Sequence, residues 1–480
     1  MSSSPPSPST RWWALVVLGL TQLMVVLDGT IVAIALPAAQ ADLGIDDGQR
    51  QWVVTAYAVT FSALLLLGGR IADYWGRKRT FMVGMVGFGA ASVWGGLAQS
   101  GGELIAARGL QGVFAALLAP AALAMVAVLF PSGRDRNVAF AVFGIIAGTG
   151  AAFGFLLGGV LTQYADWRWC LLVNIFFVVA GLIGGKLLLV ESKAEGDTRY
   201  DVLGTVTVAL GLGALIYGFA RAEHGWGESD TIGFLAVGGV LLAVFVWWQG
   251  RTSHPLLPLR VVRDRVRGGA FLLQAFVGVV MVGAMLYLTF HFQIVLGLSP
   301  VAAGFGNVAM TVVIMATAPI STKLFTTFGP RVVLTVGPLL VAAGLFFLSG
   351  ITAEGSYWSE VLPGMVVMGL GFSLIFVPLQ NLALAGVDPH DAGVASALAN
   401  ASMHVGGSIA VAVFTALYTS SVTDALASGT ARMPALAGAY GDVLFAAAWV
   451  MVLGAVTSFA LIRGPKAALT PPTDAVVAAH

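Results

Sequence analysis

The sequence predicts an all-α protein that crosses a membrane about fourteen times. Three observations support this fold class. Of the 480 residues, 58% are hydrophobic and only 10% are charged, whereas a soluble domain carries about 25% charged residues. Apolar runs of roughly 17–25 residues, the length that spans a bilayer, recur along the chain. Nineteen of the 24 Lys and Arg residues fall in loops on one side of this topology and four on the other, which predicts cytoplasmic termini.

The apolar runs are separated by short breaks that are charged or rich in glycine, so each run is expected to form one helix. The expected spans are residues 12–36, 51–71, 80–98, 103–130, 138–163, 169–190, 202–220, 231–249, 269–292, 302–325, 332–351, 358–385, 394–418 and 440–462. Their even number places both termini on the same side of the membrane.

A weak internal repeat predicts the domain organisation. Aligning Gly76 with Gly329 places Lys78 on Arg331, while Asp73 falls on Thr326. Two parallel halves of six helices, with two extra helices between them, account for this repeat. The expected parts are a disordered cytoplasmic N-terminus (1–11), an N-terminal six-helix bundle (12–190), two linker helices with charged cytoplasmic flanks (191–267), a C-terminal six-helix bundle (268–463) and a cytoplasmic tail (464–480).

The most unusual break, which we call the basic segment, covers residues 68–79. It holds four basic residues, one acid and three glycines, a composition that indicates a tight cytoplasmic loop between the second and third helices. We expect Asp73 to accept hydrogen bonds from the N-terminus of a neighbouring helix. An ordinary positively charged loop, without a special role, is the alternative interpretation.

Several motifs resemble one transporter family. Gly69, Asp73, Gly76, Arg77 and Lys78 fill the pattern G-x-x-x-D-x-x-G-R-[KR], which follows the second helix of major facilitator superfamily transporters. The segments that resemble the fourteen-helix drug:proton antiporter branch of that superfamily are 27–37, 104–112, 167–174, 293–304 and 393–407. The resemblance implies the major facilitator fold and alternating access between two six-helix bundles.

The fifth expected helix departs from this resemblance at one position. Antiporters of the branch carry G-P-x-x-G-G there, and this chain has Phe155 in place of the proline. The helix retains glycines that allow close packing against a neighbouring helix. We name as packing glycines Gly150, Gly154, Gly158 and Gly159.

Asp28 is the only carboxylate well inside an expected span, and Arg108 enters the membrane at a similar depth from the fourth helix. Ionisable residues inside a membrane are costly and therefore usually functional. We expect Asp28 to carry the coupling proton and to compete with a cationic substrate, with Arg108 close to it. A structural ion pair, or an arginine that extends towards the membrane surface, is the alternative.

Other polar and aromatic residues in the spans are candidates for lining a substrate cavity, although packing is an alternative role for each. They are Tyr57, Phe61, Gln111, His291, Gln293, Asn307, Phe376, Gln380, Asn381, Asn400 and His404.

Several function classes lack a basis in the sequence. The single cysteine excludes an internal disulfide and a cysteine-based metal cluster. A nucleotide-binding loop, a catalytic triad and a basic nucleic-acid patch are also missing from the sequence. We therefore expect no enzyme activity, metal or cofactor. The resemblance to drug:proton antiporters implies the proton gradient as the energy source.

The resemblance implies a monomeric exporter of lipophilic, cationic or neutral drugs or antibiotics, working in exchange for protons in a bacterial cytoplasmic membrane. Two alternatives are an uptake or facilitated-diffusion transporter of a small metabolite, and a non-transporting membrane sensor.

Overall fold

The computed structural model describes residues 8–131, 133–193, 201–222, 225–253, 255–384 and 392–463. The regular secondary structure of these residues is entirely helical, as predicted. Each of the fourteen expected spans falls on a helix. Within the described ranges, eleven helices are long and apolar enough to cross a membrane, and a bent helix raises this number to twelve. Fourteen membrane crossings therefore stay a prediction.

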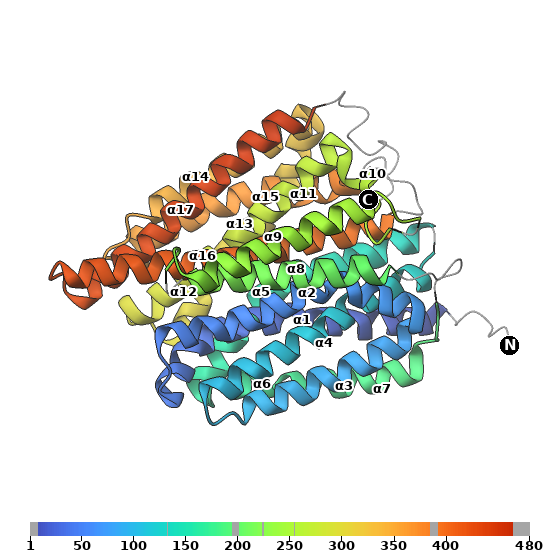
Figure 1. The fold of residues 1–480 in the computed structure, drawn as a ribbon, viewed down its shortest axis with the longest axis horizontal. Helices are drawn as coiled ribbons and strands as arrows, with labels where there is room; N and C mark the ends of the chain where they lie inside the picture. Colours follow the sequence, from blue (N-terminus) through green and yellow to red (C-terminus); the bar gives the residue numbers. More distant parts are fainter. Residues whose placement is uncertain are drawn as a thin grey trace. The chain divides into compact units, whose positions relative to one another are not determined.

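The chain divides into two compact units, each of which is a bundle of helices (Figure 1). Unit 1 comprises Met1–Gly213, Val240–Phe245 and Ser299–Phe305. Its main helices are α1 (Pro8–Leu43), α2 (Asp47–Trp75), α3 (Arg77–Gly96), α4 (Gly101–Leu129), α5 (Gly133–Tyr164), α6 (Trp169–Leu172) and α7 (Asn174–Leu188). Helix α4 packs against α2 and α3, α5 packs along α1, and α7 contacts both α1 and α3.

Two helices of unit 1, α2 and α4, begin after residues whose side chains accept a free backbone N–H group. Asp46 accepts a hydrogen bond from the N–H of Gln49 at 2.7 Å, and Ser100 caps α4 in the same way. Helix α1 begins at Pro8, where the missing N–H of proline costs nothing. Residues 8–11 are therefore helical, whereas the sequence analysis placed them in the disordered N-terminus; residues 1–7 lie outside the described ranges.

The basic segment is almost entirely helical, which corrects the expectation of a loop. Helix α2 continues to Trp75 and α3 starts at Arg77, so Gly76 alone separates them. Gly76 has a φ of 126°, a conformation that glycine adopts readily and other residues rarely do. Helix α2 also bends by 51° between Gln49–Leu65 and Leu67–Trp75.

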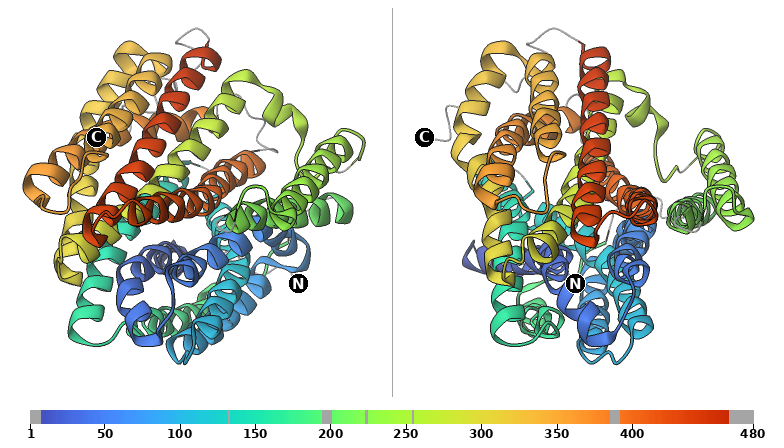
Figure 2. Two further views of the ribbon diagram at one scale, coloured as in Figure 1. Left: turned by 60° about the vertical axis from the view of Figure 1, so that its left-hand side comes forward. Right: turned by 90° about the vertical axis from the view of Figure 1, so that its left-hand side faces the viewer.

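Unit 2 comprises Ala214–Gly239, Val246–Leu298 and Gly306–His480. Its main helical segments are α11 (Arg265–Gly278), η2 (Val279–Ala284), α12 (Met285–Phe290), η3 (His291–Val295), α13 (Pro300–Phe328), α14 (Pro330–Leu348), η4 (Tyr357–Val361), α15 (Leu362–Leu384), α16 (Ala392–Ala427) and α17 (Arg432–Leu461). Helix α14 packs against α15 and α17, and α11 packs against α16 (Figure 2). The ninth expected span is a continuous helix whose η2 and η3 segments are π-helical.

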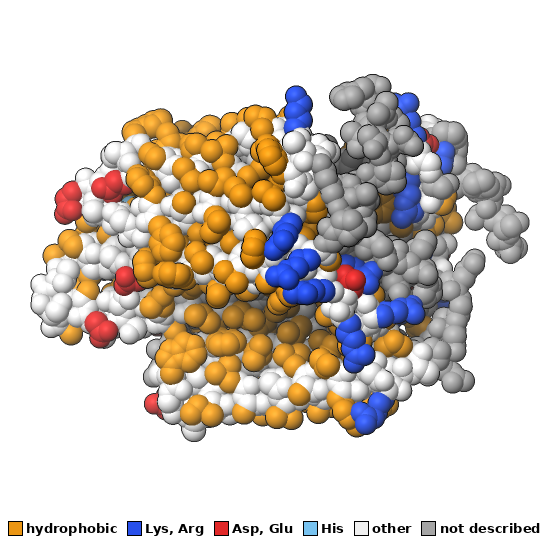
Figure 3. All heavy atoms as spheres, turned by 90° about the horizontal axis from the view of Figure 1, so that it is seen from above, with side chains coloured by type: hydrophobic (Ala, Val, Ile, Leu, Met, Phe, Trp, Pro, Cys, Tyr) orange, Lys and Arg blue, Asp and Glu red, His pale blue; other side chains and the backbone are white. Residues whose placement is uncertain are grey.

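The linker contains two long helices, α8 (Val202–Arg221) and α9 (Ser229–Gln249), and the short helix α10 (Leu259–Arg263). Glycines bring α8 and α9 together, because a Cβ at Gly218 would lie 2.9 Å from the backbone nitrogen of Leu235. Many large hydrophobic side chains on α8 and α9 are exposed. Hydrophobic side chains are also spread over the described part of the face in Figure 3, as expected for helices in contact with lipid.

Candidate functional site

Asp28 of α1 and Arg108 of α4 are in direct contact inside unit 1. The Nη1 atom of Arg108 donates a hydrogen bond to Asp28 Oδ2 at 2.6 Å. Both side chains are almost completely buried, with 0% of Asp28 and 1% of Arg108 exposed. The two ionisable residues that the sequence singled out thus form one buried ion pair.

Two amide side chains complete the shell around the Asp28 carboxylate. Its Oδ1 atom accepts hydrogen bonds from Gln111 Nε2 at 3.0 Å and from Asn174 Nδ2 at 2.7 Å. Gln111 Oε1 also accepts from Arg108 Nη1 at 2.8 Å, and Gln111 Nε2 donates to Ser92 Oγ at 2.8 Å. The polar cluster of Asp28, Arg108, Gln111, Asn174 and Ser92 therefore joins α1, α3, α4 and α7.

Helix α2 contributes an aromatic wall to this polar cluster. The Cζ atom of Arg108 lies 4.4 Å from the centre of the Tyr57 ring, a distance typical of a cation–π contact. The Phe61 ring stacks on Tyr57 with 5.7 Å between ring centres. Arg108 Nε donates to the carbonyl oxygen of Val53 at 3.3 Å. The guanidinium group thus contacts a carboxylate, an amide, a carbonyl and an aromatic ring.

The packing glycines of α5 allow α1 to approach closely beside the polar cluster. A Cβ at Gly154 would lie 3.0 Å from the carbonyl oxygen of Leu27, and one at Gly158 would lie 2.9 Å from that of Ile31. Gly150 likewise faces Val26. These contacts fix α1 on both sides of Asp28 in the chain.

Gly159 has a different neighbour, the first turn of α13. A Cβ there would lie 2.6 Å from the carbonyl oxygen of Pro300, and one at Gly304 would lie 2.5 Å from that of Phe155. The position that departs from the antiporter pattern therefore contributes its backbone to a close contact between α5 and the first turn of α13, which belongs to unit 1.

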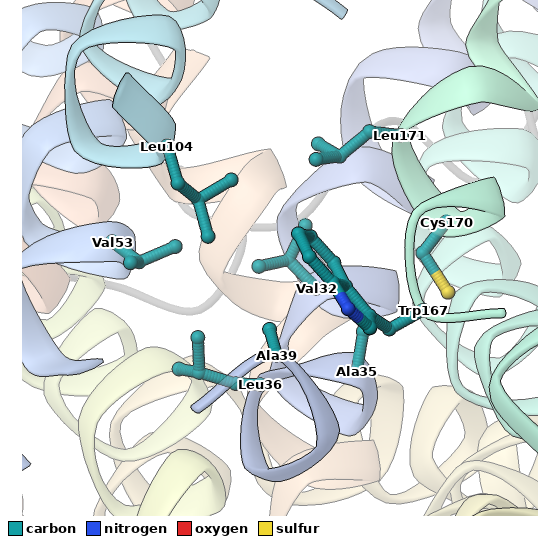
Figure 4. Close-up of a pocket in the computed structure, with 9 residues that line it drawn as sticks. All are labelled: Val32, Ala35, Leu36, Ala39, Val53, Leu104, Trp167, Cys170 and Leu171. Atoms are coloured by element: carbon teal, nitrogen blue, oxygen red, sulfur yellow. The ribbon is translucent and has the colours of Figure 1, made fainter. Parts of the chain in front are cut away.

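Figure 4 shows an apolar pocket, two of whose lining residues lie one helical turn from the members of the ion pair. Val32 follows Asp28 by four residues on α1, and Leu104 precedes Arg108 by four on α4. The pocket is lined by Val32, Ala35, Leu36, Ala39, Val53, Leu104, Trp167, Cys170 and Leu171. A water-sized molecule finds about 10 Å³ of space in it, far less than the roughly 300–1,000 Å³ of a drug-sized site. The pocket is therefore too small for a drug-sized molecule, and it lies towards the C-terminal end of α1 from Asp28.

A second group of polar contacts closes the same end of unit 1. Asp42 Oδ2 accepts hydrogen bonds from Trp167 Nε1 at 3.1 Å and from Arg168 Nη1 at 2.6 Å. Arg168 Nη2 donates to the carbonyl oxygen of Ala98 at 3.2 Å. These bonds join α1, the turn after α3 and the segment before α6, and they hold Trp167 in the wall of the pocket.

In the basic segment, Asp73 does not cap a neighbouring helix as we expected. Its Oδ1 atom instead accepts from the side chain of Arg77, the first residue of α3, with Nη2 at 2.8 Å. The carboxylate that accepts hydrogen bonds from the N-terminus of α3 belongs to Glu191, which follows α7. Gly69 lies against Pro120 without strain, since a Cβ there would be 3.5 Å from that side chain.

The other candidate cavity residues belong to unit 2. His291 is fully buried in η3, where neither ring nitrogen has a hydrogen-bond partner among the described residues. Asn307 Nδ2 donates to Thr289 Oγ1 at 3.1 Å. Phe376 stacks on Phe372. Gln293, Asn400 and His404 are partly buried, Gln380 is exposed, and the side chain of Asn381 lies outside the described residues.

Buried formal charge is confined to unit 1 among the described residues. The fully buried Asp, Glu, Lys and Arg side chains are Asp28, Arg50 and Arg108. Arg50 Nη1 donates to Gln40 Oε1 at 2.8 Å. The buried polar side chains of unit 2 are hydroxyl, amide and imidazole groups.

Sequence reasoning missed three residues of these sites. Ser92 and Glu191 were not singled out at all, and Asn174 was noted only as part of a motif. A polar residue in the middle of an apolar helix, as at Ser92, was the available signal. Glu191 gave none, because it lies among other charged linker residues.

Comparison with known sequences gives consistent matches. The sequence model of the Major Facilitator Superfamily matches residues 18–411. The puromycin resistance protein of Streptomyces alboniger is 42% identical over 464 residues, which cover 95% of this chain and 92% of that protein. The cephamycin export protein of Amycolatopsis lactamdurans is 35% identical over 458 residues, covering 93% and 92%. The tetracenomycin C resistance and export protein of Streptomyces glaucescens is 33% identical over 415 residues, covering 86% and 77%.

Solved structures share the fold at low sequence identity. A bacterial homologue of the human lysosomal transporter Spinster, in an inward-facing and occupied conformation, has a TM-score of 0.66 and 16% identity, covering 98% of this chain and 100% of that chain. An auto-inhibited peptide transporter of the POT family has a TM-score of 0.67 and 17% identity, covering 94% and 97%.

Proposed function

The chain belongs to the major facilitator superfamily of membrane transporters, and on this premise we propose that it exports lipophilic drugs or antibiotics in exchange for protons. The names of three relatives that are at least 33% identical, each a resistance or export protein for an antibiotic, support this substrate class. The single observation that carries the proton-exchange part is the buried Asp28–Arg108 ion pair.

The geometry of this pair supports a mechanism of competition. In the ionised form, Asp28 accepts three N–H bonds, one of them from Arg108. Protonation removes the attraction between the carboxylate and the guanidinium, because only a charged carboxylate forms the ion pair. A cationic substrate is likewise attracted only to the charged form of the Asp28 carboxylate. Proton and substrate then exclude each other, and this exclusion produces exchange instead of co-transport.

The orientation follows from the distribution of positive charge. We place the chain in a bacterial cytoplasmic membrane as a monomer, with the basic segment and both termini in the cytoplasm. The end of unit 1 that carries Asp42 and Arg168 is then outside. The apolar pocket lies between that end and the ion pair, so in this arrangement Asp28 is shielded from the external solution.

Efflux from loaded cells or vesicles tests the proposal. We expect a lipophilic cationic dye and puromycin to leave cells faster when the chain is expressed, and a protonophore to abolish the difference. A panel of dyes, quaternary amines, sugars and amino acids identifies the class of substrate. Transport confined to sugars or amino acids would favour the uptake alternative. Efflux that ignores the proton gradient would refute proton exchange, and no movement of any member would favour a sensor.

A further inference from the structure

The N-terminus of α3 carries an excess of positive charge that no residue of α3 itself compensates. Its first three residues are Arg77, Lys78 and Arg79, and its first turn contains no acid. The N-terminal end of a helix carries partial positive charge, so three cations there are unfavourable. The N-cap position is Gly76, which has no side chain to accept a backbone N–H.

Glu191, which follows the end of α7, supplies the missing acceptor. Its Oε1 atom accepts a hydrogen bond from the backbone N–H of Lys78 at 3.1 Å, and Oε2 accepts from that of Arg79 at 3.1 Å. The N–H of Arg77 donates to the carbonyl oxygen of Ser192 at 3.0 Å. The three first N–H groups of α3 therefore all find acceptors in the two residues 191 and 192.

The side chain of Lys78 in turn donates hydrogen bonds to free carbonyl groups at the C-terminal end of α7. Its Nζ atom donates to the carbonyl oxygens of Lys186 at 3.1 Å and Leu189 at 2.6 Å, at the end of α7. A cation is favourable at that end because it carries partial negative charge. A Cβ at Gly76 would lie 2.6 Å from Glu191 Oε1, so the glycine leaves the space that the carboxylate fills. We call this pair of contacts the reciprocal clasp; it joins α3 and α7, which lie side by side (Figure 1).

The second copy of the internal repeat contains the counterpart of the Lys78 contact. Arg331, which aligns with Lys78, follows Gly329 at the start of α14. Its Nε atom donates to the carbonyl oxygen of Phe459, in the last turn of α17, at 3.1 Å. Lys78 and Arg331 each follow a glycine, Gly76 or Gly329, by two positions. Each therefore bonds a carbonyl at the end of a later helix, α7 or α17.

We infer that Glu191 is a positioning residue for transport, which holds the basic segment against α7 by capping α3. This inference rests on the proposed transport function. The Asp73–Arg77 ion pair joins α2 to α3, so the link from the basic segment to α7 consists of the contacts of Glu191 and Lys78 together with the bond from the Arg77 N–H to Ser192. With the clasp intact, the cytoplasmic ends of α3 and α7 move as one body during alternating access. Without it, the end of α3 frays and the change between the two states slows.

Protease sensitivity tests the clasp without any transport assay. Arg77, Lys78 and Arg79 are consecutive trypsin sites in the purified full-length protein. Loss of a helix cap is worth ~1 kcal/mol, which corresponds to about a fivefold increase in the open form. We expect Glu191→Ala to be cleaved there about fivefold faster than the wild type and Glu191→Gln to be intermediate. The exposed Glu354 provides the matched control Glu354→Gln, which should match the wild type. Unchanged cleavage in Glu191→Ala would overturn the clasp.

Transport kinetics test the positioning role. We expect Glu191→Ala to lower the maximal efflux rate several-fold while the substrate concentration for half-maximal rate stays unchanged, because Glu191 lies outside the proposed substrate site. Arg79→Met separates capping from the longer Arg79–Glu191 ion pair of 3.7 Å. It should transport like the wild type, and trypsin should cleave it after Arg77 and Lys78 at the wild-type rate. An Arg79→Met variant as impaired as Glu191→Ala would overturn the inference. A wild-type chain that moves no substrate would refute the proposed function and leave the cleavage result standing.

Discussion

Replacing Asp28 by Asn tests how the buried ion pair combines stability with coupling. The carboxylate accepts bonds from Arg108 on one oxygen and from Gln111 and Asn174 on the other. An amide has one acceptor and one NH2 group, so either orientation of Asn directs N–H groups at another donor. Arg108 also loses its counter-charge while it stays buried. Removing one partner of a buried pair costs about 3–5 kcal/mol, and we expect a loss of this size in the free energy of unfolding.

A double-mutant cycle tests whether the loss of stability in Asp28→Asn comes from the unpaired charge of Arg108. Arg108→Gln removes the stranded charge, so we expect Asp28→Asn/Arg108→Gln to recover about 2–3 kcal/mol over Asp28→Asn alone. The double variant should fold and reach the membrane, yet fail to drive efflux of a cationic substrate with the proton gradient. Denaturant unfolding in detergent measures the four free energies, and vesicle efflux measures coupling. A double variant no more stable than Asp28→Asn would refute the ion-pair reasoning, and full gradient-driven efflux by Asp28→Asn would move the coupling site elsewhere.

Three further predictions concern packing, the basic segment and the pocket. Gly154→Val should lower the yield of monodisperse protein in size-exclusion chromatography, because its Cβ meets the α1 backbone, whereas Gly29→Ala, with no atom within 4 Å of the added Cβ, should match the wild type; equal yields would contradict the close packing. Asp73→Asn should slow turnover by weakening the bond to Arg77 and leave substrate binding in detergent nearly unchanged, so an equal loss of both would refute a switching role. Cys170, which is fully buried, should resist alkylation until the protein is unfolded in detergent, as mass spectrometry would show; rapid labelling of the folded protein would mean that the pocket is open.

The contact between Asp28 and Arg108 was foreseeable because helix geometry is regular. A constant rise per residue converts a position in a span into a depth, and both residues gave similar depths from the outer ends of their helices. The same reasoning could not identify Ser92 or Asn174 as partners. Depth alone leaves the direction of a side chain around the helix undetermined, and these long apolar helices have little amphipathic pattern to fix it.

Other features depend on contacts between residues that are distant in the sequence. The hydrogen bond between Glu191 and the N–H of Lys78 joins residues 113 positions apart, so local patterns gave no reason to prefer this acid over Asp73. The basic segment read as a loop because its charges do not belong in hydrocarbon, yet a helix that extends beyond the membrane tolerates them equally well. The π-helical η2 and η3 segments lie in an apolar run that would serve an ordinary α-helix, so composition alone did not reveal them.

Among the described residues, buried charge is confined to unit 1, and this has a consequence for how the protein can evolve. A substitution beside Asp28 or Arg108 risks stranding a charge, and therefore most changes there are penalised before any benefit to recognition appears. In unit 2 the buried polar side chains are neutral hydroxyls and amides together with His291, where exchanges carry smaller penalties. Random mutagenesis under selection for resistance to a new compound should therefore collect its surviving mutations mainly in unit 2.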